Sequence, residues 1–270
     1  MKPPVKIDRV ALFIAQYLSW ARQRRVYATF APFISYRGHA CDTWELLPTL
    51  GRHRLPVDIL KRQETEVIDQ FRDRFGSSEW TDMEVLAFAR HHGAPTRLLD
   101  WSTNPFVGLW FAISETKHDS TPGVVFQLAT SGSNHVICAA EKFKLAFADN
   151  CGCKRPIHIF ASPPRVQRTD RQRSVFTIAS FNGDYILKPL EQIVQSETAT
   201  PMRKFVVPSD LKPELRRLLS DLGLDAYSIY GDADSFGKSV ALRMDISDMK
   251  ISDAEKPAGK PDGPGAARNI

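Results

Sequence analysis

Cysteine and long apolar runs are both scarce in this 270-residue sequence, and each scarcity excludes a class of protein. Four cysteines are too few for the dense disulfide framework of a small secreted domain, so we expect free thiols. The pair Cys151 and Cys153 is spaced too closely for a Cys-x-x-Cys zinc site, so no metal is expected. No apolar run approaches the roughly 20 residues that span a bilayer, and residues 1–25 lack the apolar centre of a secretory signal. We therefore expect no membrane association and a cytoplasmic location.

The standard catalytic motifs are absent as well. The sequence contains no Gly-x-Ser-x-Gly elbow, no Walker phosphate loop, no Rossmann glycine fingerprint and no His-Glu-x-x-His. These absences disfavour serine hydrolysis, Walker-type nucleotide hydrolysis and zinc proteolysis. The formal net charge of +5 arises beside 31 acidic residues, so the chain is only mildly basic. Such a charge permits a polyanionic partner without requiring one.

What the chain does contain is enough apolar material, 43% of its residues, for one large domain. Helices and strands do not alternate regularly, which favours an α+β fold with a mixed or antiparallel sheet core and flanking helices. We expect a single domain over residues 1–250, with a core at about 26–130 and a strand-rich half at 131–250. The polar residues 251–270 are expected to form a disordered tail. Helices are predicted at residues 7–24, 57–75 and 209–222, and short strands at residues 26–36, 123–129, 157–162, 174–180, 185–190 and 204–208.

Capping residues mark two further helices. Thr81 and Glu84 form a capping-box pattern, and Gly93 stands where a left-handed C-terminal cap belongs. Asn104 precedes a proline and is expected to cap the next helix, to about residue 115. The intervening "APTRLLDWST" is expected to be a loop. Likewise, Ser209 is expected to cap the helix at 209–222.

Two polar segments suggest a site. "YRG", residues 36–38, is expected at the end of a strand, and "RHHGAPTRLLDWSTNP" from Arg90 gathers histidine, arginine, aspartate and indole side chains. Loops with such mixtures often carry function. A structural explanation also stays open: Arg97 can pair with Asp100, and Arg37 can pair with an acidic residue behind the sheet.

Three blocks, "FISYRGH", "WELLPTLGR" and "FARHHGAPTRLLDWSTNPFVGLWFA", resemble the FRG domain, which is named for its Phe/Tyr-Arg-Gly signature. The resemblance covers about residues 36–112, and it is specific because the last block agrees in both residues and spacing. The block departs from the family pattern where Arg90 and His91 replace an apolar–Gln pair and where Gly108 replaces an alanine. The resemblance implies a bacterial or phage-related setting and a domain boundary more readily than an activity.

A more distant resemblance is to the ADP-ribosyltransferases, whose strand-end basic residue holds NAD and whose third strand bears Glu or Gln. Tyr36-Arg37-Gly38 resembles the first motif, Trp101-Ser102-Thr103 resembles the second, and Gln172 stands in the third place. This resemblance implies a split sheet with Arg37 and Gln172 in the site, and with Asp100 these are the residues that we expect to be catalytic. It implies that NAD, or another phosphate-bearing small molecule, is the ligand. ADP-ribose would go to an unknown protein or nucleic acid acceptor, in a toxin or an anti-phage effector.

The residue types fit NAD chemistry. Arg37 offers a planar set of donors to a pyrophosphate, and Gly38 lets a ligand approach the backbone. Ser102 or Thr103 is expected to orient a ribose, and Trp101 or Tyr36 to stack on nicotinamide. The same segment supplies three further candidate NAD contacts, which are His92, Thr96 and Arg97.

The reaction itself calls for an anionic group. Cleavage of the nicotinamide–ribose bond develops positive charge on the ribose, which a carboxylate would stabilise. Gln172 cannot supply that charge, so Asp100, Asp170 and Asp232 are the candidates. Without such a group the chain would transfer nothing.

Two other functions stay open. One is a non-enzymatic module that binds a ligand or a protein. The other is nucleic-acid contact through the basic segment of Arg165, Arg168, Arg171 and Arg173, with Phe176 or Tyr185 stacking on bases. A solvated basic loop explains the same arginines without any partner.

Overall fold

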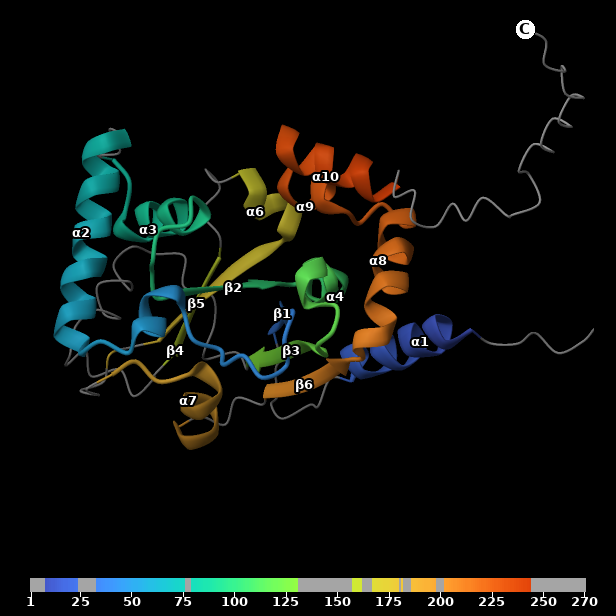
Figure 1. Ribbon diagram of the computed structural model, residues 1–270. Helices are drawn as coiled ribbons and strands as arrows, with labels where there is room; N and C mark the ends of the chain where they lie inside the picture. The colour runs from blue at the N-terminus through green and yellow to red at the C-terminus, as the bar shows by residue number, and fades with distance from the viewer. Residues whose placement is uncertain are drawn as a thin grey trace, which may run out of the picture.

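The computed structural model describes residues 8–23, 33–75, 79–130, 157–161, 167–179, 181, 186–197 and 202–243. Their centre is a six-stranded sheet of order β4-β5-β2-β1-β3-β6, in which every neighbouring pair is antiparallel (Figure 1). With helices packed around it, the sheet confirms the predicted α+β class. The strands are β1 (Phe33–His39), β2 (Leu98–Ser102), β3 (Gly123–Thr130), β4 (Ile157–Ala161), β5 (Ser174–Ala179) and β6 (Met202–Val207).

Several helices begin and end where the sequence predicts. The helix at 57–75 is confirmed at both ends, and Thr81 and Glu84 make the full capping box. The Asn104 side chain accepts a hydrogen bond from the backbone N–H of Phe106 at 2.9 Å. The helices are α1 (Arg9–Arg22), η1 (Thr49–His53), α2 (Val57–Phe75), α3 (Asp82–His91), α4 (Pro105–Ile113), η2 (Thr116–His118), α6 (Gln167–Gln172), α7 (Leu190–Glu197), η3 (Ser209–Leu211), α8 (Lys212–Asp221), α9 (Ala226–Tyr230) and α10 (Ala233–Arg243).

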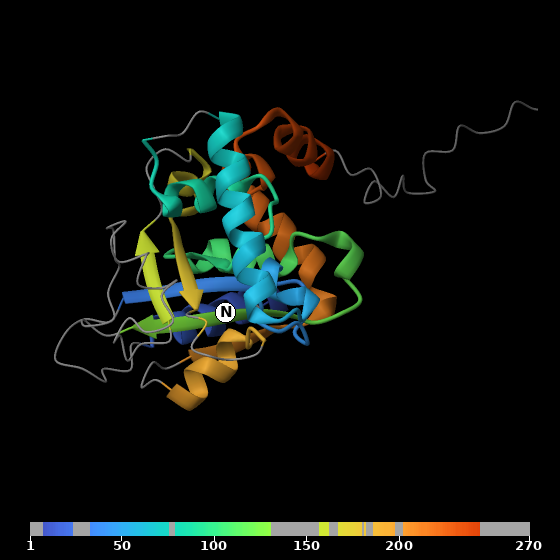
Figure 2. The ribbon, with the colours of Figure 1, turned by 90° about the vertical axis from the view of Figure 1, so that its left-hand side faces the viewer.

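Helices cover both faces of the sheet. On one face, α1, α4 and α8 bury apolar side chains around Tyr36 and Val125. Beside them, α2 and α3 pack on Leu98 and Phe176 of β2 and β5. On the other face, α7 packs in a cluster that includes Trp101 and Phe126. Figure 2 shows α7 below the strands, with α2 and α8 rising above them.

Strands β1 and β2 have the shortest pairing in the sheet. These strands pair at a single position, Tyr36 with Ser102, whereas β1 and β3 pair from Phe33 to His39 along the whole of β1. The chain therefore leaves room between β1 and β2 for side chains instead of a hydrogen-bonded ladder. The sheet is nevertheless one continuous unit, and a split sheet of the ADP-ribosyltransferase kind stays a prediction.

Of the predictions around the polar segments, one is confirmed to within a residue and one was wrong. "YRG" lies near the end of β1, directly before its last residue, His39. Residues 98–102 form β2 and not a loop, because Leu98, Leu99 and Trp101 are buried on both faces of the sheet. The segment predicted as a loop thus supplies a central strand, which fixes the position of Asp100.

Predictions in the later part of the chain need further correction. Residues 186–189 form no strand beyond a single bridge from Ile186 to Pro56, and α7 begins at Leu190. Ser209 does not cap α8, because the η3 turn intervenes and α8 begins only at Lys212. The helices α6, α7, α9 and α10 were not predicted.

Some predictions fall on residues that are not described. These are the first part of the strand at 26–36, Cys151 and Cys153, Arg165, Tyr185 and the tail at 251–270. Of the helices that are described, none combines the length and the apolar character needed to cross a membrane.

Candidate functional site

A cavity of about 960 Å³ opens where β1 and β2 separate. The three residues predicted to be catalytic, Arg37, Asp100 and Gln172, all line it. Tyr36, Gly38, Trp101 and Ser102 of the predicted NAD-binding set line it too. Segments far apart in the sequence thus meet at one place, and the wall is completed from η1, α3, α4 and α9.

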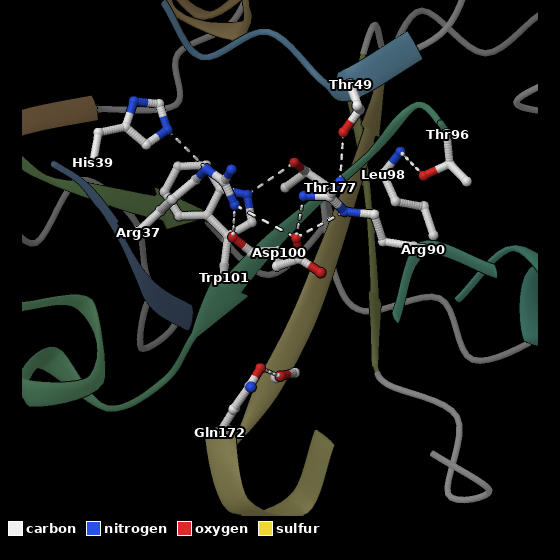
Figure 3. A network of polar contacts seen from close by, with 11 residues as sticks. Arg37, His39, Thr49, Arg90, Thr96, Leu98, Asp100, Trp101, Gln172 and Thr177 are labelled. Atoms are coloured by element: carbon white, nitrogen blue, oxygen red, sulfur yellow. Dashed lines mark hydrogen bonds and ion pairs between the residues drawn. The ribbon is translucent and has the colours of Figure 1, made fainter. Parts of the chain in front are cut away.

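Arg37 bridges the gap between the two strands. Its Nη1 donates a hydrogen bond of 2.6 Å to the backbone carbonyl of Asp100, and its Nε donates to Nε2 of His39 at 3.1 Å (Figure 3). Its Nη2 has no hydrogen-bond partner among the residues that the structure describes. Burial lowers the pKa of Arg37 to about 10, so the side chain is cationic at neutral pH. The arginine is held in place on two sides while still lining the cavity.

His39 serves Arg37 as a neutral acceptor. Because its Nε2 accepts from Arg37, the ring proton lies on Nδ1, which faces the carbonyl oxygen of Trp44 at 3.3 Å. Burial, followed by the charge of Arg37, lowers the pKa of His39 to about 3. The imidazole therefore adds no positive charge near neutral pH, and it orients the guanidinium of Arg37.

Asp100 is shared by two arginines. Its Oδ2 accepts from Nε and Nη2 of Arg90 at 3.0 and 2.9 Å and lies 3.7 Å from Nη1 of Arg37. Burial alone would raise the pKa of Asp100, but the charges of Arg90 and Arg37 outweigh it and hold that pKa below its usual value. Nη1 of Arg90 also donates to Thr49 of η1. One carboxylate thus faces two cations.

Other charged side chains in the cavity wall are paired among themselves. Glu45 accepts from Arg54, and Glu115 pairs with Lys117 at 3.0 Å. Arg52 lines the cavity but has no ion-pair partner in the described part of the chain. Within the described wall, five cations stand against three carboxylates, so the cavity favours an anionic ligand.

Gln172 lies at the end of α6 and is tied to its surroundings. Its backbone carbonyl accepts from the Ser102 hydroxyl at 2.6 Å, and its Nε2 donates to the carbonyl of Ile229 at 3.3 Å. Its Oε1 faces the hydroxyl of Ser174 at 3.4 Å. Figure 3 shows Gln172 apart from the network of Arg37, Asp100 and Arg90. The amide joins α6, β5 and α9 at one end of the cavity.

Gly38 has a packing role that the sequence did not reveal. A Cβ at this position would lie 2.0 Å from the carbonyl oxygen of Gly108 and 2.5 Å from the backbone nitrogen of Ala112. Close packing also explains why glycine replaces the alanine of the FRG pattern at Gly108, since a Cβ there would lie 2.9 Å from Cβ of Tyr36. The two glycines let α4 lie against β1, which sets the depth of this wall.

Four of the predicted NAD-binding residues lie outside the described cavity wall. Thr96 and Arg97 are fully buried, and Arg97 pairs with Glu64 of α2 at 2.6 Å, so the predicted alternative of pairing with Asp100 was wrong. His92 is exposed at the end of α3, where its ring packs on Phe88, and Thr103 is exposed. Their contact with NAD stays a prediction that the geometry does not support.

The remaining candidate carboxylates and arginines lie apart from Arg37. Asp170 is exposed on α6, and Asp232 accepts from the backbone N–H of Ser235 at the start of α10. The guanidinium of Arg171 lies 5.7 Å from the centre of the Tyr227 ring. None of these residues is part of the described cavity wall.

The structure adds residues that sequence reasoning did not assign. Trp44, Glu45 and Arg52 line the cavity and lie in or beside "WELLPTLGR", whose match to the FRG pattern was the available signal. Arg90 was noted only as a departure from that pattern. Glu115 and Tyr230, which also line the cavity, carried no signal.

Comparison with known proteins finds a family match for one segment of the chain. Residues 33–121 match the family model of the FRG domain, and they include β1, η1, α2, α3, β2 and α4. No curated protein matches the chain. No solved structure matches it either. The matched segment, residues 33–121, is therefore an FRG domain, and it contains Arg37, Arg52, Arg90 and Asp100.

Proposed function

We propose that the cavity binds NAD and that the protein transfers ADP-ribose from it to an acceptor. The observation that carries this proposal is the meeting of Arg37, Asp100 and Gln172, from three separate segments, in one cavity of about 960 Å³. Ligand sites in proteins are commonly cavities of a few hundred to about 1,000 Å³. A dinucleotide therefore has room beside these side chains.

The wall offers groups for the pyrophosphate and for a base of NAD. The excess of guanidinium groups suits the pyrophosphate, and the Trp44 side chain, 41% exposed at the rim, offers an aromatic face to a base. In the reaction, the bond between ribose C1′ and the nicotinamide nitrogen breaks, and neutral nicotinamide leaves with the electron pair. The acceptor forms a new bond to C1′ and releases its proton.

Carboxylates in the cavity supply the charge that Gln172 lacks. Asp100 is ionised at neutral pH, since its pKa is lowered, and Glu115 lies in the same wall. Either anion stabilises positive charge that develops on the ribose. Sequence reasoning named Asp100 for this role, and Glu115 is a second candidate.

A binding module without enzymatic activity is the second candidate function. The observation that favours it is the engagement of Gln172, whose amide contacts Ile229 and Ser174. In such a module the cavity would hold an anionic ligand and leave it intact.

Release of nicotinamide distinguishes the two functions. The protein is incubated with NAD labelled in the nicotinamide ring or in the adenylate, alone and with protein or nucleic acid acceptors. We expect nicotinamide release with transfer of the adenylate label, both lost in Arg37→Ala and kept in Arg9→Ala. Arg9 is the control because it pairs with Asp210 on the surface and does not line the cavity. Binding of NAD without release of nicotinamide, whether or not an acceptor is present, would reject the transferase and favour the binding module.

A further inference from the structure

We infer that Arg52, Arg90 and Arg37 together form a subsite for a diphosphate group, in which Arg52 is the guanidinium without an ion pair among the described residues. The inference deepens the proposed function and rests on it for the identity of NAD as the whole ligand. The diphosphate chemistry can be tested without NAD.

The η1 turn brings Arg52 to this position. Thr49 and Arg52 are three residues apart in a 3₁₀-helix, where side chains at i and i+3 lie on the same side. Thr49 accepts a hydrogen bond from Arg90, so Arg52 lies on the face of η1 that is directed toward Arg90. Arg90 in turn shares Asp100 with Arg37. The three guanidinium groups therefore form one chain of neighbours along the wall.

The three cations share one carboxylate. Asp100 is the one anion that pairs with any of them among the described residues. Glu45 and Glu115, the other carboxylates of the wall, are engaged by Arg54 and Lys117. Two positive charges are thus left without a counterion, which matches the two negative charges of a dinucleotide's pyrophosphate. Guanidinium groups bind such oxygens with paired, charge-assisted hydrogen bonds.

Mutual repulsion among the arginines supports the same conclusion. Burial, followed by the charge of Arg90, lowers the pKa of Arg52. The pKa of Arg37 is lowered to about 10 chiefly by burial, and the charges of Arg90 and Arg52 act in the same direction. Like charges held this close oppose folding, and a bound dianion would relieve the repulsion. Placing the three arginines together therefore lowers the stability of the fold, and a ligand-binding site explains why they are nevertheless close.

Binding of inorganic pyrophosphate to the full chain tests the inference. Titration calorimetry at about 0.1 M salt compares wild type with Arg52→Gln, which removes a side chain that forms no ion pair with the residues that the structure describes. We expect wild type to bind pyrophosphate and Arg52→Gln to bind it about tenfold more weakly. Arg62→Gln is the matched control, since Arg62 is exposed on α2 and outside the cavity wall, and its affinity should equal that of wild type.

Two more arms complete the experiment. Arg52→Lys keeps the charge without the planar set of donors and should bind with intermediate affinity, which excludes a folding defect as the cause. Adenosine monophosphate and ADP-ribose are titrated in parallel, and ADP-ribose should bind more tightly because it carries the diphosphate. Equal affinity for both nucleotides would identify a phosphomonoester site and overturn the inference. So would equal binding of pyrophosphate to wild type and Arg52→Gln, or no binding to wild type.

The outcome is separable from that of the proposed function. Pyrophosphate binding that depends on Arg52, without nicotinamide release from NAD, supports the subsite and rejects the transferase. Nicotinamide release with the same KM for NAD in wild type and Arg52→Gln supports the transferase and rejects the subsite.

Discussion

Arg37 is held by the backbone of Asp100 and not primarily by its carboxylate. Nη1 of Arg37 lies 2.6 Å from the carbonyl oxygen of Asp100 but 3.7 Å from Oδ2, whereas Oδ2 accepts two hydrogen bonds from Arg90. Main chain and side chain of one residue therefore position two different arginines. The sequence left open whether Arg37 pairs internally or contacts a ligand, and this geometry is compatible with both roles together.

Because the Asp100 side chain binds Arg90 and its backbone binds Arg37, we predict that the Asp100 side chain is coupled more strongly to Arg90 than to Arg37 in double-mutant cycles. Asp100→Asn and Arg90→Gln should show a coupling free energy of about 1 kcal/mol, since they remove the same partly exposed ion pair. Asp100→Asn and Arg37→Gln should show a weaker coupling, because the two charges lie 3.7 Å apart without a hydrogen bond and the bond to the backbone carbonyl is unaffected. Urea unfolding of the single and double variants measures both. Stronger coupling to Arg37 than to Arg90 would contradict the geometry.

The packing of α4 on β1 predicts that Gly38→Ala is strongly destabilising. The added methyl would meet the backbone of Gly108 and Ala112, which cannot rotate away as a side chain can, and we expect a loss of about 3 kcal/mol or more in the free energy of unfolding. Gly237→Ala on α10 is the control. Nothing lies within 4 Å of the added atom there, and alanine favours the helix, so stability should rise by up to about 1 kcal/mol. Chemical denaturation measures the free energy of unfolding of both variants. A loss of less than about 1 kcal/mol in Gly38→Ala would argue against the close contact of α4 with β1.

Local signals in the sequence predicted the starts of α3 and α4, and long-range packing explains the errors. The capping box at Thr81 and the Asn104 cap involve neighbours within three residues, so sequence alone identifies them. β2 was missed because "LLDWS" lies between turn residues and too few of its positions alternate. Its strand character comes from pairing with β5, whose residues lie more than 70 positions later.

The candidate site was predicted in part for the same reason. Arg37 and Asp100 were named from motifs, and both line the cavity. Arg97 was named from the same block, but its partner Glu64 is 33 residues earlier on α2, which no local pattern reveals. Arg52 was not assigned, because its role depends on the contact between Thr49 and Arg90. Residues that act through distant partners require the fold.

The buried pair of Arg97 and Glu64 predicts a large effect on stability. Both side chains are fully buried, and the pair is linked at 2.6 Å. The backbone N–H of Arg97 also donates to Glu64, and Nη1 of Arg97 donates to the carbonyl of Ala179. Glu64→Gln leaves the arginine's charge buried without its counterion, so we expect unfolding to become easier by about 3–5 kcal/mol. Glu66→Gln, at an exposed position of the same helix, should change stability by less than about 0.5 kcal/mol. Thermal and urea unfolding measure both, and equal stability of the two variants would show that the pair is dispensable.

His39 predicts how stability depends on pH. Its pKa is about 3 in the folded protein, chiefly through burial, and about 6.5 in an unfolded chain. Between these values the unfolded state binds more protons, so stability from this residue is complete above about pH 6.5 and falls as the pH decreases. From pH 7.5 to 4.5 the loss amounts to about 2.7 kcal/mol, with a slope that approaches about 1.4 kcal/mol per pH unit.

Removing the titrating ring isolates this contribution. His39→Gln keeps a group that can accept from Arg37 and donate toward Trp44, but it has no proton to gain in this range. Asp100 does not confound the comparison, because its lowered pKa keeps it ionised down to the lower end of the range. Urea unfolding at several pH values should therefore give a shallower dependence for His39→Gln than for wild type, while the exposed His53→Gln follows wild type. Parallel curves for wild type and His39→Gln would mean that His39 titrates freely in the folded protein and does not remain the neutral acceptor that orients Arg37.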